Sequence, residues 1–316
     1  MSVTITLGGV TITGAGVTFV APPPVIPVAT AGWFYGGTPG GPTEWSTIDR
    51  ITFATDTTAA SVRGSLSFGR RSTASAGTYN YGWVIGGYGN GGSLSSVDRI
   101  TYASDTGTSS QRGSLSASGY SGAAVSDGLT YTWLAGIPNN AVLSRIALAT
   151  DTATPTARGS LSAARQSLAA AGTSLYGWFM GGSGPVSRVD RVDYANDTGT
   201  ASIRGPLTQA RFMGGVTTDS TTYAWYAGGN DPAIASIERI TYATDTATAV
   251  SRGTLANARY YLSGVGSDTY GWYGGGFPGV ISTVTRLTYA TDTATTSNTS
   301  NLSVARGNLS ASSGVQ

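Results

Sequence analysis

Apolar and polar positions alternate in short segments along the chain, and helical spacing of apolar residues is not found. The pattern is clearest between residues 166 and 211. Four segments there have the alternation or the aromatic and β-branched content of strands, and turn-forming residues separate them. They are Leu168–Thr173, Tyr176–Met180, Arg188–Tyr194 and Thr200–Arg204. We therefore expect four short antiparallel strands in this part of the chain.

The same unit occurs six times. Each copy is marked by an aromatic segment around a tryptophan and, later, by an aspartate followed by threonine. The tryptophans are Trp33, Trp83, Trp133, Trp178, Trp225 and Trp272, and the aspartates are Asp56, Asp105, Asp151, Asp197, Asp245 and Asp292. Four-stranded repeats of roughly 40 to 50 residues are typical of propeller blades. The sequence therefore predicts an all-β, six-bladed β-propeller of four-stranded antiparallel blades over residues 29–316.

The order of residues within the unit resembles a known family. A strand of small residues, Tyr-x-Trp-x-x-Gly-Gly, a loop, a strand with Arg-(Ile/Val)-x-(Tyr/Phe) and a polar strand follow one another, as in kelch-type repeats. Two features depart from that family: Gly136 is followed by Ile137 in the third unit, and the tryptophan of kelch strand four is missing. The wording Asp-Arg-Ile-Thr-Tyr-Ala-Thr-Asp-Thr-Ala-Thr also resembles repeat proteins encoded in marine bacteriophage genomes, which implies a virion protein.

The first unit lacks a strand of small residues before Trp33. Three prolines, Pro22–Pro24, precede it, and proline cannot donate the hydrogen bonds of a central strand. The chain ends instead with Leu309–Val315, which follows Arg306 in the same register as Leu168–Thr173 follows Arg165. We therefore expect the C-terminal segment to supply the inner strand of the first blade and to close the ring.

Residues 1–28 lie outside the predicted ring. Val3–Leu7, Val10–Thr13 and Val17–Val20 have the alternation of strands, and a proline-rich spacer follows them. One interpretation is a frayed terminus. The interpretation that we favour is an anchoring arm whose strands pair with a partner chain or with another copy of this chain. Its apolar positions are Val3, Ile5, Val10, Ile12, Val17 and Phe19.

Composition limits the chemistry of the chain. It contains no cysteine, histidine or lysine, which excludes disulfides, thiol nucleophiles, Ser-His-Asp triads and imidazole-ligated metals. A net charge of +2 gives no basis for binding nucleic acid, and neither a membrane span nor a secretory signal is present. With two glutamates and no recurring carboxylate pair, a glycan hydrolase is the less favoured alternative. We expect no enzyme activity, cofactor or metal.

The charged residues mostly follow the repeat. Sets of arginines lie in the third strand, seven residues after the repeat aspartate and fourteen residues after it. They are Arg50, Arg99, Arg145, Arg191, Arg239 and Arg286; Arg63, Arg112, Arg158, Arg204 and Arg252; and Arg70, Arg165, Arg211, Arg259 and Arg306. Repetition in every blade favours a structural role, with arginines bridging blades to the aspartates or to loop carbonyls. We expect the aspartates to form turns. We expect the tryptophans to be core residues of the second strand or to pack between blades.

The loops between the second and third strands vary most between units. We expect them to emerge on the same face as the connections from the fourth strand to the next blade, and such loops commonly carry recognition. Aromatic and amide side chains suited to sugars occur in them, and unconstrained loop drift is the alternative. These candidate binding residues are Trp45, Tyr88, Asn139, Asn140, Asn230, Asp231 and Phe277.

Together these observations predict a non-enzymatic virion protein. The arm would dock the disc on other virion proteins, and the loop face would bind a partner or a host-surface glycan. Both a receptor-binding protein of the tail and a decoration protein of capsid or tail fit this prediction. An intracellular kelch-like module for protein interaction is the alternative from a different class.

Overall fold

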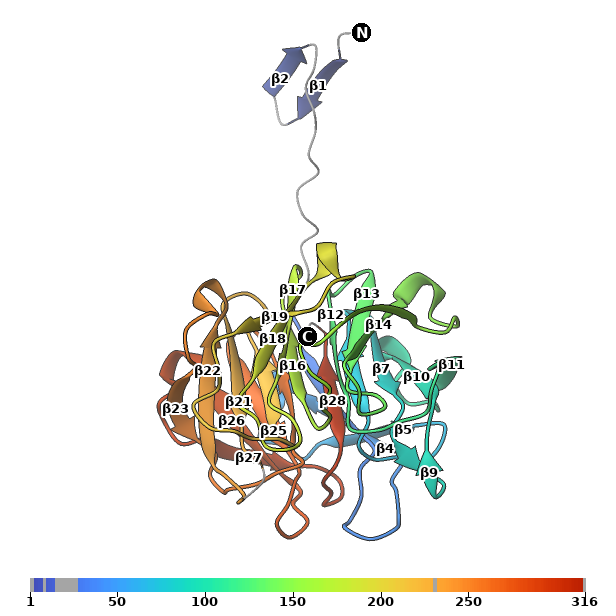
Figure 1. Cartoon of the computed structure of the whole chain (residues 1–316), viewed down its shortest axis with the longest axis vertical. Coiled ribbons are helices and arrows are strands. Elements are labelled where there is room, and N and C mark those ends of the chain that lie inside the picture. The colour runs from blue at the N-terminus through green and yellow to red at the C-terminus, as the bar shows by residue number, and fades with distance from the viewer. Residues whose placement is uncertain (1–2, 8–9, 15–27, 230–231, 315–316) are drawn as a thin grey trace.

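The computed structural model describes residues 3–7, 10–14, 28–229 and 232–314 of the chain. Within these residues, six four-stranded antiparallel sheets are arranged around a central axis (Figure 1). Each sheet is one blade, and its strands are hydrogen-bonded in order from the innermost to the outermost. The prediction of a six-bladed β-propeller is confirmed.

The blades have the following strands. Blade 1 contains β28 (Ser310–Ser313), β3 (Ala31–Tyr35), β4 (Thr47–Thr52) and β5 (Ser61–Ser65). Blade 2 contains β6 (Ala74–Gly77), β7 (Tyr81–Ile85), β10 (Ser96–Thr101) and β11 (Ser110–Ser114). Blade 3 contains β12 (Ala123–Ser126), β13 (Tyr131–Ala135), β14 (Val142–Ala147) and β15 (Thr156–Ser160).

Blade 4 contains β16 (Ala169–Gly172), β17 (Tyr176–Met180), β18 (Val189–Asp193) and β19 (Ser202–Arg204). Blade 5 contains β20 (Gly215–Thr218), β21 (Tyr223–Ala227), β22 (Ser236–Thr241) and β23 (Val250–Thr254). Blade 6 contains β24 (Ser263–Gly266), β25 (Tyr270–Gly274), β26 (Thr283–Thr288) and β27 (Ser297–Asn301). A small hairpin of β8 (Tyr88–Gly89) and β9 (Gly92–Ser93) lies in the loop between β7 and β10.

A 3₁₀ turn follows the third strand of each blade. These turns are Phe53–Thr55, Tyr102–Ser104, Leu148–Thr150, Tyr194–Asn196, Tyr242–Thr244 and Tyr289–Thr291. The turn in blade 4 explains why β18 ends at Asp193, although the sequence pattern extends to Tyr194. The first residue of the turn points its side chain at the neighbouring blade, as described below.

The innermost strands are made of small residues because the blades converge at the axis. An added Cβ on Gly264, in the innermost strand of blade 6, would lie 2.2 Å from the carbonyl oxygen of Val216 in the innermost strand of blade 5. Similarly, an added Cβ on Gly77 would lie 2.3 Å from the carbonyl oxygen of Ser313. Larger side chains at such positions would push the blades apart.

The C-terminal segment completes the first blade, as the sequence predicted. Strand β28 pairs antiparallel with β3, and the register places Ser312 opposite Trp33. The side chains of β28 are buried, and Ser312 Oγ lies 2.7 Å from both the Tyr35 and the Tyr102 hydroxyl oxygens. The last strand of the chain therefore joins the first blade to the second.

The hydrophobic core is divided into layers between neighbouring blades. Each cluster of buried apolar residues combines side chains of two adjacent blades, and the layer between blades 4 and 5 contains Trp178, Met180, Tyr226 and Ile240. Equivalent layers lie at the other blade boundaries. Stability therefore depends on the ring being closed, because an unpaired blade would expose half of a layer.

The two faces of the disc carry different connections. On the loop face, the loops between strands two and three pair with the turns that enter the same blade, as in the bridges Arg71–Tyr88 in blade 2 and Tyr260–Phe277 in blade 6. This confirms the expectation that both kinds of connection share one face. On the opposite side, which we call the arm face, the turns between strands one and two surround Val28 and Ala29. The chain thus enters the ring from the arm face.

The N-terminal region contains strands β1 (Val3–Leu7) and β2 (Val10–Gly14). These strands pair antiparallel with each other, with Ile5 opposite Ile12 and Val3 opposite Gly14. Val10 is opposite Leu7 in the same hairpin. The predicted strand Val17–Val20, with Val17 and Phe19, lies outside the described residues. Whether the hairpin also pairs with a partner stays a prediction.

Candidate functional site

A belt of hydrogen bonds joins neighbouring blades near the outer strands. We define the belt as the repeat aspartates together with the tryptophan and arginines that contact them. Asp197 of blade 4 accepts from Trp133 Nε1 at 2.8 Å, from Arg145 at 2.9 Å and from Arg158 at 2.8 Å, all in blade 3. Its side chain is only 2% exposed. This confirms that arginines bridge the blades through the repeat aspartates.

The repeat aspartates lie in turns, as expected, but their side chains bond across the blade boundary and not within the turn. The turn is closed by a backbone bond, for example from Ala153 N to the carbonyl oxygen of Thr150. The carboxylate of Asp151 is directed at blade 2 and accepts from Trp83 Nε1 at 3.0 Å. Because the tryptophan lies 68 residues before the aspartate, this partner could not be found from local turn patterns.

Aromatic stacking strengthens the same boundaries. The first residue of the 3₁₀ turn stacks on the tryptophan of the preceding blade, with ring centroids 3.8 Å apart for Trp133 and Tyr194. Burial raises the pKa of the Tyr194 hydroxyl well above its ordinary value. At the boundary of blades 2 and 3, Leu148 replaces the tyrosine and packs in the same layer as Trp83. These contacts confirm that the tryptophans pack between blades.

A second set of arginines fixes the turns that enter each blade on the loop face. Arg70 is fully buried, and its guanidinium donates to the carbonyl oxygens of Gly86 and Ser96 and to Asp98 at 3.1 Å. Arg165 with Asp190, Arg211 with Glu238 and Arg306 with Asp49 form the corresponding pairs. These buried pairs hold the entrance of the inner strand against the loop between strands two and three.

Blades 3 and 6 depart from this arrangement in different ways. In blade 3, Gly119 stands where the arginine would be and Ser144 where the acid would be, and Ile137 fills the space. In blade 6, Arg259 is kept and buried, but Thr285 stands where the acid would be. Burial lowers the pKa of Arg259 to about 10. Its guanidinium is held by Thr285 and by backbone carbonyls, without an acidic partner among the described residues.

A ring of residues with left-handed backbone surrounds the central axis on the loop face. We call these six residues the collar, one immediately before or near the inner strand of each blade: Ser72, Ser121, Ser167, Met213, Tyr261 and Asn308. Their φ angles lie between 53° and 60°, although none is glycine. Such φ values are uncommon for other residues and carry strain of order 1 kcal/mol or more.

The collar is closed by its own backbone hydrogen bonds. The N–H of each collar residue donates to the carbonyl oxygen of the collar residue in the preceding blade, from Ser121 to Ser72 at 2.7 Å and from Ser72 to Asn308 at 2.9 Å. The remaining bonds run from Asn308 to Tyr261, Met213 and Ser167 and back to Ser121, with distances of 2.5 to 3.1 Å. These bonds compensate the strain and give all six positions one rigid backbone geometry.

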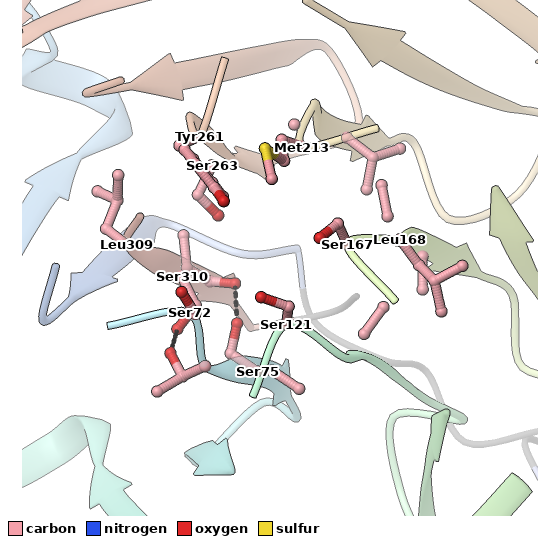
Figure 2. A pocket seen from close by; sticks show the side chains of 18 of the residues that line it. Ser72, Ser75, Ser121, Ser167, Leu168, Met213, Tyr261, Ser263, Leu309 and Ser310 are labelled. Atoms are coloured by element: carbon pink, nitrogen blue, oxygen red, sulfur yellow. Dashed lines mark hydrogen bonds between the residues drawn. The ribbon is translucent and has the colours of Figure 1, made fainter. Parts of the chain in front are cut away.

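The collar frames a cavity of about 120 Å³ at the mouth of the central channel. Figure 2 shows Ser72, Ser121, Ser167, Met213 and Tyr261 placed around the opening. Deeper in the channel the wall consists mostly of alanine, glycine and serine from the inner strands, including Ser75 and Ser263. The lining residues, all within the described part of the chain, include no charged side chain.

The loop-face candidates from the sequence fall into three groups. Tyr88 and Phe277 extend the surroundings of the mouth: Tyr88 contacts Tyr120 edge-on with centroids 5.9 Å apart, and Phe277 lies against the rings of Tyr260 and Tyr261. The guanidinium of Arg71 lies over the Tyr88 ring at 5.0 Å. These residues are therefore next to the collar.

Trp45, Asn139 and Asn140 are not among the residues that line the cavity. Trp45 is half-buried, and its carbonyl oxygen accepts from the backbone N–H of Arg70. Asn140 accepts from the backbone N–H of Val142, whereas Asn139 is exposed. Asn230 and Asp231 lie outside the described residues.

The sequence contained a signal for the collar that our interpretation missed. Aligning the units on position plus fourteen shows that no two units have the same pair of residues after it, although serine recurs at the second position in three consecutive units. The pairs are Arg71-Ser72, Tyr120-Ser121, Gln166-Ser167, Phe212-Met213, Tyr260-Tyr261 and Gly307-Asn308. Variation at one rigid backbone position is typical of a recognition surface.

Among the described residues, no group of three or more Asp, Glu, His or Cys side chains is placed to hold a metal ion. A search of the same residues finds no helix with the length and apolarity needed to cross a membrane.

The fold defines the protein as a six-bladed β-propeller whose belt is shared by its blades and whose collar contains serine in three consecutive blades and three other residue types in the rest. Comparison with models of known protein families finds no match, and comparison with curated proteins finds none either.

Proposed function

We propose that the protein is a non-enzymatic, kelch-like propeller of a phage particle. In this proposal the arm face and residues 1–28 dock on other virion proteins, and the loop face binds a partner protein or a host-surface glycan. The observation that carries the proposal is the opposite placement of two features. The chain enters the disc at Val28 on the arm face, whereas the variable collar surrounds the channel mouth on the loop face.

The arm face has the exposed apolar side chains that docking requires. Tyr79, Leu129 and Leu175 occupy the turns between strands one and two in the consecutive blades 2, 3 and 4, and they are 50%, 56% and 63% exposed. Val28, where the chain enters, is 54% exposed. Apolar residues grouped on one face favour contact with another protein. Another copy of this chain is the second kind of partner that such a face could bind.

A role in binding rather than catalysis is supported by the state of the carboxylates. Those of the belt are held by arginine and tryptophan of the preceding blade, and those in the third strands are held by buried arginines. The chain has no histidine or cysteine to act as base, nucleophile or metal ligand. The rigid repeat therefore serves as a scaffold for the collar and its surroundings.

The assignment to a phage particle is supported by the resemblance of the repeat wording to repeat proteins of marine bacteriophages. We expect an antibody against residues 29–316 to label purified particles in immunogold electron microscopy. Particles without label, with the protein confined to the host cytoplasm, would contradict the proposal and favour an intracellular interaction module.

Docking can be tested with matched variants. We expect a chain without residues 1–28, or the double variant Leu129→Ser and Leu175→Ser, to fold and yet be missing from particles. The loop-face variant Tyr261→Ser is the control and should be incorporated normally. Loss of incorporation by Tyr261→Ser alone would show that the faces have been assigned in the wrong sense.

A further inference from the structure

We propose that the mouth of the central channel, framed by the collar, binds one uncharged sugar ring at the end of a glycan. This inference rests on the proposed function, because it names the ligand class of the loop face. It assigns the binding to Ser72, Ser121, Ser167, Asn308, Met213 and Tyr261, with the neighbouring aromatic residues in a supporting role.

The cavity contains no charged side chain among its described lining residues. The residues that line the cavity within the described chain are neutral, and they combine hydroxyl, amide, aromatic and aliphatic groups. Arg71, which precedes Ser72, has its guanidinium over the Tyr88 ring and 3.7 Å from Glu44. A carboxylate or phosphate entering the cavity would lose water without meeting an opposite charge, which is unfavourable. The cavity therefore selects an uncharged ligand.

Polar and apolar side chains occupy different parts of the mouth. Three consecutive blades contribute the serine hydroxyls, and the following two contribute Met213 and Tyr261 (Figure 2). Asn308 adds an amide between Tyr261 and Ser72 in the order of the ring. A pyranose ring has hydroxyl groups at its edge and C–H groups on its faces. It can therefore bond to the serines and the amide while it packs on the tyrosine ring.

The backbone groups of the collar are already hydrogen-bonded. Its N–H and C=O groups bond to one another around the ring, with distances of 2.5 to 3.1 Å. An extended peptide usually binds to such a scaffold by adding main-chain hydrogen bonds to a sheet edge. In the collar the main chain is already engaged, and side-chain groups carry the recognition. This favours a ligand that is rich in hydroxyl groups over a peptide.

Size limits the ligand to a single ring. The cavity of about 120 Å³ is smaller than the roughly 300–1,000 Å³ of pockets for drug-sized ligands. A longer glycan would therefore extend out of the mouth, where Tyr120 is 40% exposed beside Tyr88. The backbone of the collar is fixed before the ligand arrives, so little ordering is needed on binding.

The test uses the full chain and the methyl glycosides of glucose, galactose, mannose and N-acetylglucosamine. Glucuronic acid and N-acetylneuraminic acid are the charged comparisons. We expect saturation-transfer NMR to detect binding of at least one neutral glycoside and of neither acid. Absence of binding by all four neutral probes, or stronger binding of an acid, would overturn the inference, as would a peptide that binds the collar when the sugars do not.

Two tyrosine substitutions locate the site. Tyr261→Ser introduces the residue that blades 2, 3 and 4 carry in the same backbone conformation, and we expect it to weaken binding about tenfold or more. Tyr261→Phe keeps the ring and should weaken binding less. Tyr79→Ser on the arm face is the matched control and should leave affinity unchanged. Equal affinity in Tyr261→Ser and the natural chain would overturn the assignment to the collar.

The outcomes separate this inference from the proposed function. If the antibody labels phage particles but the protein binds none of the neutral glycosides, the sugar site alone is refuted. A protein that binds a neutral glycoside through Tyr261 but is missing from particles would refute the virion role alone.

Discussion

The belt and the collar are both repeated around the ring, but the belt repeats its side chains and the collar repeats its backbone conformation. In the belt the side chains recur, because each boundary needs an acceptor for a tryptophan and for arginines of the preceding blade. In the collar the backbone conformation recurs, with φ between 53° and 60°, whereas the side chains are serine in blades 2, 3 and 4 and methionine, tyrosine and asparagine in the other blades. Side chains that bond across the blade boundaries therefore recur from blade to blade. The collar is closed by backbone hydrogen bonds, and its side chains are less uniform. This contrast supports the proposal that the loop-face mouth is the binding site.

The largest effect should come from removing the segment that completes the collar and the first blade. Deleting residues 307–316 removes Asn308 from the collar and β28 from blade 1, and it exposes the edge of β3. We expect loss of the cooperative thermal transition followed by circular dichroism. Deleting residues 1–27 is the control and should keep the transition. A truncated chain with the thermal transition of the natural chain would contradict the closure of the ring.

Acid should break the belt before it affects the collar. Burial by itself would raise the pKa of Asp151, but hydrogen bonds from Arg112 and Trp83 and the nearby arginine charges lower it below its ordinary value. The pKa values of Asp197 and Asp292 are lowered in the same way. A lowered folded-state pKa means that the stabilisation is complete above the ordinary carboxylate pKa and is lost as pH falls through the folded value.

We therefore expect the free energy of unfolding in urea to be level between pH 5 and 8, where no histidine titrates, and to fall below about pH 4. Urea titrations at a series of pH values measure this. A decline between pH 8 and 5 would show that groups outside the belt control stability.

A single belt position should have a smaller but clear effect. Asp197→Asn keeps an acceptor for Trp133 and removes the charge that faces Arg145 and Arg158. Because the two arginines are partly exposed, we expect a loss of about 2 kcal/mol in the free energy of unfolding, below the range for fully buried pairs. Asp268→Asn, an exposed carboxylate on the arm face, should change it by less than about 0.5 kcal/mol. Equal effects of the two substitutions would contradict the role of the belt.

Much of this architecture could be predicted because local sequence patterns determine the strands. The segment Tyr176–Met180 was predicted with the bounds that β17 has, since alternation and aromatic content determine a strand locally. The role of Asp197 was predicted only in part. Its turn is local, but Trp133, which donates to its carboxylate, lies 64 residues earlier. Contacts between blades form only when the ring is closed. The pattern of a single unit therefore does not show which residues of two blades meet.

The collar was missed for a related reason. A left-handed conformation at Ser121 or Met213 is not indicated by residue type, because glycine and asparagine are the residues that usually adopt it. The conformation is imposed by the hydrogen bonds of the closed ring. The sequence shows the variation at these positions. The loops between strands two and three vary in length as well, and the binding residues were therefore predicted there.

Blade 6 offers a substitution that should stabilise the protein. Arg259 is buried beside Thr285, whereas Arg70, Arg165 and Arg306 each face an aspartate. Thr285→Asp would supply the missing charge, and we expect a gain of about 1 kcal/mol in the free energy of unfolding because the desolvated guanidinium is already present. Thr285→Asn provides the neutral control. A loss of stability in Thr285→Asp relative to Thr285→Asn would show that the carbonyls around Arg259 already compensate its charge.

The smallest effect should come from exchanging side chains within the collar. Ser121→Asn introduces the residue that blade 1 carries at Asn308 with φ of 58°, close to the 60° of Ser121. We expect the free energy of unfolding to change by less than about 0.5 kcal/mol, because asparagine tolerates this conformation and the backbone bonds are kept. Ser121→Val is the contrasting variant: a β-branched residue is strained at positive φ and should cost about 1–3 kcal/mol. If both substitutions cost the same, the backbone of the collar would not be the repeated element, and the contrast with the belt would fail.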